Sequence, residues 1–264
     1  MDVSHLNRIA QPKPAAVMPL AKALALLAAF SAREPKLGNG DLAARTGLPR
    51  ATVTRLVSTL VHEGYLHQTP IDRKFTLAPS VLALGYGAVA HGQLRCPVEE
   101  RMKEFAERHQ IQVSISARDR LELIVVDSRR AAGSQLQAGV PTGSRVGIAG
   151  SPMGWALLAA LPRCERDYLT DSIERNGPTE WQRVRRLAND AIARVQHDGY
   201  CTSLSWTTQA LGVVAAPLLI GRDPPLVLAC IGGGLRMTHA RMERELAPSL
   251  LTLAGQIVQE ASVS

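Results

Sequence analysis

The sequence lacks several features by which other classes of protein are recognised. Its most apolar stretch, residues 211–220, is too short to cross a bilayer and contains Pro217. Residues 1–16 carry polar side chains and prolines where a secretory signal would have an apolar segment. The four cysteines lie at least 29 residues apart, so no pair has the spacing of a zinc or redox motif. We therefore expect a cytoplasmic protein with reduced thiols and no membrane contact.

Acidic residues are scarce in the first third of the chain. The 264 residues include 30 Lys and Arg against 23 Asp and Glu, a formal net charge of +7. Residues 1–95 contain 11 basic and five acidic residues, a net charge of +6, whereas residues 96–264 contain 19 and 18. A basic module beside a nearly neutral one fits a polyanion-binding part joined to a part with another role. Ordinary surface variation is the alternative explanation of this difference.

The first third contains three helical patterns, two of which enclose a glycine turn. Apolar residues recur at helical spacing over residues 19–30. A second helix is expected from Asn39 or Asp41, either of which suits the N-cap, to a C-terminal glycine at Gly47. The third covers residues 50–63 and has one apolar stripe. Two short helices joined by a tight turn that contains glycine are typical of a helix-turn-helix.

The polar face of the third helix carries basic and hydroxyl side chains and has no acid before Glu63. Such side chains bond phosphate oxygens and base edges. Two short strands follow, and the turn between them forms the tip of a hairpin typical of a wing. The alternative is a small helical bundle with a hairpin that binds no DNA. The residues predicted to contact DNA are Arg45, Arg50, Thr52, Thr54, Arg55, Ser58, Arg73 and Lys74.

The remaining two-thirds of the chain mix helical patterns with short strands. Helices are expected over residues 97–109, 152–161, 183–197 and 243–260. Strands are expected over residues 113–117, 121–127, 213–219 and 226–231, with a turn at residues 232–234. Helices mixed with hairpin-like strand pairs predict an α+β sheet domain.

No complete catalytic, metal-binding or cofactor motif is present. Residues 85–90 match G-x-G-x-x-A, but they follow a helical run, whereas a dinucleotide-binding loop follows a strand. Ser151 directly follows Gly150, so the G-x-S-x-G register of a serine nucleophile is absent. We expect no catalytic residue, metal or cofactor. The alternative is an enzyme that acts on a small acid, for which Ser151 and Cys201 are the nucleophiles to test.

The run DLAARTGLPRATVTRL, residues 41–56, resembles the winged helix-turn-helix of IclR-type bacterial transcriptional regulators. Further similarity lies in GYL at 64–66, TLAPSVLALG at 76–85, MGWALLA at 153–159 and GVVAAP at 212–217. The resemblance implies an α+β protein with a C-terminal GAF-like effector-binding domain. Its implied parts are a flexible tail (1–16), a winged helix-turn-helix domain (17–78), a linker helix (79–95) and the effector-binding domain (96–264).

The family resemblance also implies partners and a binding site. Members are homodimers or dimers of dimers that bind pseudo-palindromic operators in double-stranded DNA, as repressors or activators, often of a catabolic operon. Their C-terminal domain binds a small-molecule effector, often an organic acid. The residues that match the family's pocket segments or could bind a carboxylate there are Arg145, Ser151, Met153, Gly154, Trp155, Ser203, Trp206, Leu211, Val213, Ile231 and Gly233.

The sequence departs from the family pattern at this pocket. Thr202 and Ser203 stand where related pockets often have an acid, and Val213 stands where a Cys or small polar residue is frequent. Trp155 replaces a frequent Lys or Arg, and Trp206 lies in a loop that is often acidic. The two tryptophans either line an apolar pocket or pack in the core or at an interface. We expect an apolar or aromatic acid as effector. A DNA binder without an effector is a third possibility.

Overall fold

The computed structural model shows two compact units, Met1–Ala88 and Val89–Ser264. The residues that the structure describes are 17–31, 34–91, 96–132, 139–204, 211–233 and 236–263. Trp206, which the sequence assigned to the effector site, lies outside them. Within this described part, no helix is both long and apolar enough to span a membrane.

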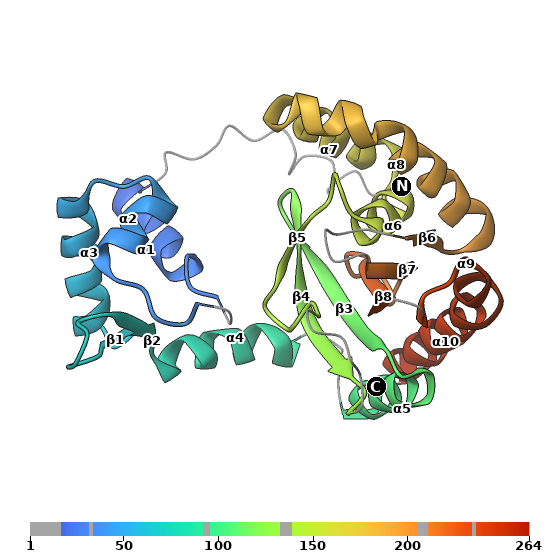
Figure 1. Ribbon diagram of the computed structural model, residues 1–264, viewed down its shortest axis with the longest axis horizontal. Helices are drawn as coiled ribbons and strands as arrows, with labels where there is room; N and C mark the ends of the chain where they lie inside the picture. The colour runs from blue at the N-terminus through green and yellow to red at the C-terminus, as the bar shows by residue number, and fades with distance from the viewer. Residues whose placement is uncertain are drawn as a thin grey trace. The chain divides into compact units, whose positions relative to one another are not determined.

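The first unit is a three-helix domain with a two-stranded hairpin (Figure 1). Its elements are α1 (Met18–Ala28), α2 (Asn39–Thr46), α3 (Arg50–His62), β1 (Leu66–Gln68) and β2 (Phe75–Leu77), followed by α4 (Pro79–His91). This order confirms the helix-turn-helix and wing predicted from the sequence. Residues 85–90, which match the dinucleotide pattern, lie inside α4.

A left-handed glycine ends α2 and begins the turn to α3. Gly47 adopts φ 68°, in the left-handed region, and its N–H donates to the carbonyl oxygen of Ala43 at 2.9 Å. The N-cap prediction of Asn39 or Asp41 was wrong by one or three residues, because Gly38 occupies that position. The Asp41 carboxylate contributes from inside the first turn, where it accepts the N–H of Gly38 at 2.9 Å.

A single apolar cluster holds the first unit together. Its buried members are Leu26, Phe30, Leu37, Leu42, Val53, Val57, Leu60, Leu66 and Phe75. Leu37 and Phe75 also exchange two backbone hydrogen bonds, at 2.8 and 3.1 Å, which tie the segment before α2 to the wing. The wing is therefore fixed to the same core that carries α3.

The second unit is built on a six-stranded antiparallel sheet with strand order β5-β4-β3-β8-β7-β6. The strands are β3 (Gln112–Asp119), β4 (Glu122–Arg130), β5 (Arg145–Gly147), β6 (Cys201–Ser203), β7 (Leu211–Leu218) and β8 (Leu226–Gly233). The helices are α5 (Cys96–His109), α6 (Pro152–Ala160), α7 (Arg163–Asn176), α8 (Pro178–Asp198), α9 (His239–Arg241), the π-helical turn η3 (Met242–Leu246) and α10 (Ala247–Val263).

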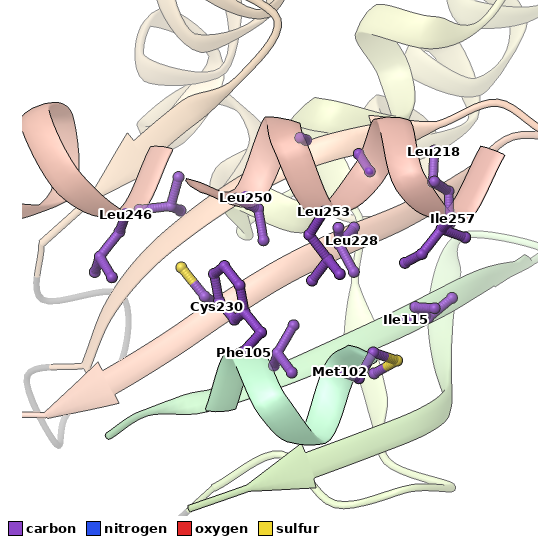
Figure 2. Close-up of a cluster of buried hydrophobic side chains, with 14 of the residues drawn as sticks. Met102, Phe105, Ile115, Leu218, Leu228, Cys230, Leu246, Leu250, Leu253 and Ile257 are labelled. Atoms are coloured by element: carbon purple, nitrogen blue, oxygen red, sulfur yellow. The ribbon is translucent and has the colours of Figure 1, made fainter. Parts of the chain in front are cut away.

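Helices cover both faces of this sheet, because successive strand residues point to opposite sides and both sides carry apolar residues. On one side, which we call the α10 face, Met102 and Phe105 of α5 pack with Leu250 of α10 against Leu228 and Cys230 of β8 (Figure 2). The opposite side, which we call the α6 face, carries a second cluster formed with α6, α7 and α8. The α+β architecture expected for the effector-binding domain is confirmed.

Several element boundaries differ from the sequence expectations. Helix α7 and the short strands β5 and β6 were not predicted. The final helix begins with the π-helical turn η3. The expected glycine turn was wrong at Gly232 and Gly233, which both lie within β8. A Cβ atom at Gly232 would lie 2.7 Å from the Cγ atom of Met237, and one at Gly212 would lie 2.5 Å from Met237 Cβ. These glycines let Met237 pack against the sheet.

Candidate nucleic-acid interface and ligand-binding face

Helix α3 presents an exposed polar face above its apolar stripe. Val53 and Val57 are buried, whereas Arg50, Arg55 and Ser58 are exposed. Among the described residues, these three exposed side chains form no hydrogen bond or ion pair, so their donors are available to a partner. The backbone of α3 therefore holds two guanidinium groups and a hydroxyl on one surface, and no other described residue competes for their hydrogen bonds.

The two predicted threonines of α3 differ in exposure. Thr54 is exposed, and its hydroxyl donates to the carbonyl oxygen of Arg50 at 3.0 Å. Thr52 is half-buried beside the apolar stripe. The hydroxyl oxygen of Thr54 keeps its acceptor capacity, because a hydroxyl has two lone pairs.

Arg45 differs from the other predicted DNA contacts because it is engaged inside its own unit. Its Nη1 atom donates to the carbonyl oxygen of Ala29 at 2.9 Å, and its Nη2 atom forms an ion pair with Glu34. These contacts join the end of α2 to the chain after α1. We therefore interpret Arg45 as a structural residue, and its predicted phosphate contact is not carried into the proposed interface.

The wing has a firmly bonded tip. Arg73 adopts φ 53°, and its N–H donates to the carbonyl oxygen of Thr69 at 3.1 Å. The Thr69 hydroxyl bonds Lys74 O at 2.8 Å and the Asp72 carboxylate, which also accepts the N–H of Lys74. The hydrogen bonds from Thr69 and from the Lys74 backbone lower the pKa of Asp72. Within the described chain, the exposed side chains of Arg73 and Lys74 form no hydrogen bond or ion pair.

The second unit brings most of the predicted effector residues together on the α6 face. Backbone pairing places Ser203 of β6, Val213 of β7, Ile231 of β8 and Gln112 of β3 in one row across the sheet. We call these four residues the central row. The apolar cluster on this face includes Met153, Trp155, Leu211, Val213 and Ile231. Gly233 ends β8 opposite Leu211.

The start of α6 is tightly built. The buried hydroxyl of Ser151 accepts the N–H of Gly154 at 3.0 Å and caps the helix. A Cβ atom at Gly154 would lie 2.2 Å from the carbonyl oxygen of Ile148, so only glycine fits there. Pro152 has no N–H, which leaves Met153 N–H as the unpaired backbone donor of this turn among the described residues. The sequence alone did not separate these structural roles from ligand binding.

Trp155 packs in the protein core. Its side chain is buried in the α6-face cluster, and its Nε1 atom donates to the carbonyl oxygen of Ala149 at 2.8 Å. With the indole donor paired inside the protein, the geometry favours the packing interpretation over a polar contact with a ligand.

Arg145 lies on the other side of the sheet from the central row. Val146 belongs to the α6-face cluster, so its neighbour Arg145 points to the opposite face. The Arg145 guanidinium bonds Asp119 and Glu122, each at 2.6 Å, and these two hydrogen bonds raise its pKa. The expectation that Arg145 binds an effector carboxylate is therefore not carried into the proposed site.

Three polar residues of β3 on the α6 face were missed by the sequence analysis. Gln112 donates to Ser128 Oγ and to the Val140 carbonyl oxygen, each at 2.6 Å, and accepts the Val140 N–H at 3.1 Å. Ser114 and Ser116 follow on the same face and are buried. The alternation Gln-Val-Ser-Ile-Ser in residues 112–116 is a usable signal, because residues two apart share a sheet face.

Cys201 has the wrong environment for a nucleophile. Burial raises the pKa of its thiol to about 12, and its sulfur lies 3.4 Å from the carbonyl oxygen of Pro152. The nearby His197 is exposed and pairs with Asp198 at 2.6 Å. A Cys–His pair at this place does not form, and Ser151 is already committed to capping α6.

Comparison with known proteins identifies the family of this chain. The IclR helix-turn-helix domain matches residues 19–70. A solved IclR family transcriptional regulator from Brucella abortus is 30% identical, with a TM-score of 0.78, over 96% of this chain and 95% of that one. The chain belongs to the IclR family of transcriptional regulators.

Other relatives of this IclR-family chain agree. The HTH-type transcriptional regulator TsaQ1/TsaQ2 of Comamonas testosteroni is 29% identical over 243 residues, 91% of this chain and 87% of that protein. An IclR homolog from Microbacterium hydrocarbonoxydans, solved in complex with 4-hydroxybenzoate, has a TM-score of 0.71 and 19% identity, over 93% of this chain and all of that one. The Brucella and Comamonas relatives are transcriptional regulators, so the alternative of a small-acid enzyme has no support from them.

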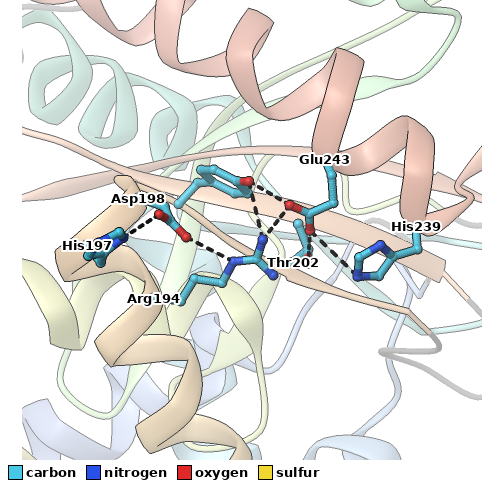
Figure 3. A network of polar contacts seen from close by, with 7 residues as sticks. Arg194, His197, Asp198, Thr202, His239 and Glu243 are labelled. Carbon is cyan, nitrogen blue, oxygen red and sulfur yellow. Dashed lines mark hydrogen bonds and ion pairs between the residues drawn. The ribbon is translucent and has the colours of Figure 1, made fainter.

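This IclR-family chain also has a polar network at the β6 edge of its sheet (Figure 3). The Glu243 carboxylate of η3 accepts hydrogen bonds from Tyr200 at 2.6 Å and Thr202 at 3.1 Å, and forms an ion pair with Arg194 of α8. Burial alone would raise the pKa of Glu243, but the hydrogen bonds and the charge of Arg194 outweigh it and lower the pKa. The network joins α8, β6 and η3 beside Ser203.

Proposed function

We propose that this regulator binds a pseudo-palindromic operator as a dimer and responds to an aromatic or apolar carboxylic acid. The proposed parts are a DNA-binding domain at 17–78, a linker at 79–95 and an effector-binding domain at 96–264. The observation that carries the DNA-binding part is the face of α3, where Arg50 and Arg55 are exposed and unpaired within the described residues.

In the proposed complex, α3 enters the major groove. Arg50, Thr54 and Arg55 contact base edges there, since guanidinium and hydroxyl groups match their acceptors. Arg73 and Lys74 of the wing contact phosphates, and the hydrogen bonds of the tip fix the backbone that carries these two side chains, which reduces the backbone entropy lost on binding. Because phosphate contacts release counterions, operator affinity should fall steeply as salt concentration rises.

Apolar helix surfaces support a dimer. On α1 the side chains of Met18, Leu20 and Leu24 are each more than half exposed, and on α4 those of Leu82 and Leu84 are too. A regulator with two-fold symmetry presents two copies of α3 to successive half-sites. We propose that a second copy of this chain covers these surfaces, and sedimentation of the full chain tests the dimer directly.

The effector is proposed to bind on the α6 face, along the central row. Val213 and Ile231 supply apolar surface there, and Ser203 supplies a hydroxyl at the β6 end. The 4-hydroxybenzoate complex of the Microbacterium relative supports an aromatic acid as the ligand class. A ligand that moves Ser203 would also move its neighbour Thr202, whose hydroxyl donates to Glu243 of η3. Ligand binding would thereby alter the position of the C-terminal helices.

A gel-shift assay on the chain's own upstream DNA, at low and high salt, tests the proposed DNA binding. Specific binding should be weakened by Arg55→Ala and unchanged by Arg163→Ala, which removes an exposed arginine of α7. A thermal-shift screen with 4-hydroxybenzoate, benzoate and cyclohexanecarboxylate tests the effector class. An unshifted melting temperature with all three acids would contradict the proposed class while leaving the DNA-binding part intact.

A further inference from the structure

Two serine hydroxyls of β3 are buried without a hydrogen-bond partner. Ser114 and Ser116 have no exposed surface, and neither hydroxyl oxygen has a hydrogen-bond partner within the described residues. A buried hydroxyl in this state is unfavourable, because it has lost its bonds to water and gained none in the protein. A partner supplied by a bound ligand is one explanation for such a group.

Ser114 lies next to the central row on the same face of the sheet. Gln112, two residues earlier, pairs with Ile231 in that row. Ser114 itself pairs with Ala229 of β8 and Ser128 of β4. These two neighbours have small side chains, so no bulky cross-strand residue flanks the Ser114 hydroxyl in its own row.

The Gln112 side chain is not available to bond a ligand. Its amide nitrogen donates to Ser128 and to Val140, and its amide oxygen accepts from Val140. Both ends of this side chain are thus occupied in holding the segment around Val140 over the sheet. Ser114 is left as the uncommitted polar group of β3 nearest to the row.

The row that runs from Gln112 to Ser203 is apolar between its two ends. The strands β3, β8, β7 and β6 are neighbours in the sheet, and Ile231 and Val213 occupy the row between Gln112 and Ser203. Three strand spacings, roughly 14 Å, separate Gln112 from Ser203, and Ser114 lies in the neighbouring row, two residues along β3 from Gln112. Ser203 ends the apolar row and Ser114 lies beside its other end, an arrangement that suits a ligand with polar groups at both ends of an apolar body.

We propose that the Ser114 hydroxyl is the second polar anchor of the effector, and that the effector is an aromatic acid with a further polar group opposite its carboxylate. This inference rests on the proposed function, whose site it specifies. The ligand's second polar group gives the Ser114 hydroxyl its missing hydrogen bond. Met153, an unbranched side chain in the same apolar cluster, can change conformation to admit the ring.

The test compares Ser114→Ala with Ser116→Ala, a matched control. Ser116 is also buried, and its hydroxyl also has no hydrogen-bond partner within the described residues. Its backbone pairs with Val125 and Val227, which places it two residues farther along β3 from the central row than Ser114. Each substitution removes an unpaired hydroxyl, so each should leave the ligand-free melting temperature unchanged or raise it by roughly 2–4 °C. The probes are 4-hydroxybenzoate and benzoate, with affinities measured by calorimetry on the full chain.

The wild type and Ser116→Ala should bind 4-hydroxybenzoate more tightly than benzoate, by about fivefold or more, and Ser114→Ala should lose this preference. Equal affinity of the wild type for the two acids would overturn the two-ended ligand class. A preference that survives Ser114→Ala would overturn the role of Ser114. Failure of the wild type to bind either acid would instead contradict the proposed aromatic effector, and this inference with it.

Discussion

The polar groups of the two units are arranged in opposite ways. On α3 and the wing, Arg50, Arg55 and Arg73 are exposed and have no intramolecular partner among the described residues. Around the α6 face, Ser151 and Gln112 are buried and already bonded inside the protein. A polyanion is recognised by charges that remain free at a surface, whereas a small apolar acid is recognised by an enclosed surface with few uncommitted polar groups.

The largest expected effect concerns the packing that underlies the α6 face. Gly154→Ala places a Cβ atom 2.2 Å from the carbonyl oxygen of Ile148, a backbone atom that cannot move aside cheaply. We expect this variant to lose about 3 kcal/mol of unfolding free energy, measured by urea denaturation. Gly255→Ala in α10 is the control, because a Cβ there meets nothing within 4 Å. It should gain about 0.5–1 kcal/mol, and equal losses in both would refute the packing argument.

Next in size is the effect of removing a free guanidinium from the DNA-binding surface. Arg55→Ala should lower the affinity for specific DNA by about tenfold to a hundredfold, since a bidentate contact to a base is worth about 1–3 kcal/mol. Its melting temperature should match the wild type, because the exposed Arg55 side chain has no hydrogen bond or ion pair to lose within the described residues. Fluorescence anisotropy with a labelled operator measures this affinity. An unchanged affinity would contradict the assignment of the base contacts to α3.

A smaller effect is expected when a polar group of the second unit that is already hydrogen-bonded inside the protein is replaced. Glu243→Gln should cost about 1–2 kcal/mol of stability at neutral pH, because the hydrogen bonds from Tyr200 and Thr202 lose their charged acceptor. The folded pKa of Glu243 is lowered, so its contribution is present above the usual pKa of 4.5 and is lost as the pH falls through the folded value. Denaturation curves at pH 7 and below 4.5 measure this, and an equal acid loss in both proteins would exclude Glu243 as a cause.

The smallest expected effect concerns Arg145, a charged group that is both exposed and bonded. Arg145→Ala removes ion pairs to Asp119 and Glu122 at the β5 edge and should cost under about 1 kcal/mol. Binding of an aromatic acid should be unchanged, because the side chain lies on the opposite face from the central row. Ser203→Ala is the companion variant and should weaken binding. A loss of affinity in Arg145→Ala would restore the original expectation for this residue.

The first unit was predictable to a large extent because its signals are local. The glycine at 47, the apolar stripe of α3 and the polar face opposite it all lie within one stretch of chain. The second unit was less predictable. Strands β5 and β6 have three residues each, too few for an alternating pattern to stand out. The sequence also left two interpretations open for Trp155, and its hydrogen bond to Ala149 favours packing in the core.

The sequence by itself determined the helix-turn-helix, the concentration of positive charge in the first third, and the α+β character of the remainder. These follow from spacing and composition along the chain. Tertiary structure decided which polar groups face one another. Strand register turns Arg145 away from the central row and Ser114 toward it, because a shift of one residue reverses the face of a side chain. Register depends on pairing between distant segments, which local patterns do not encode.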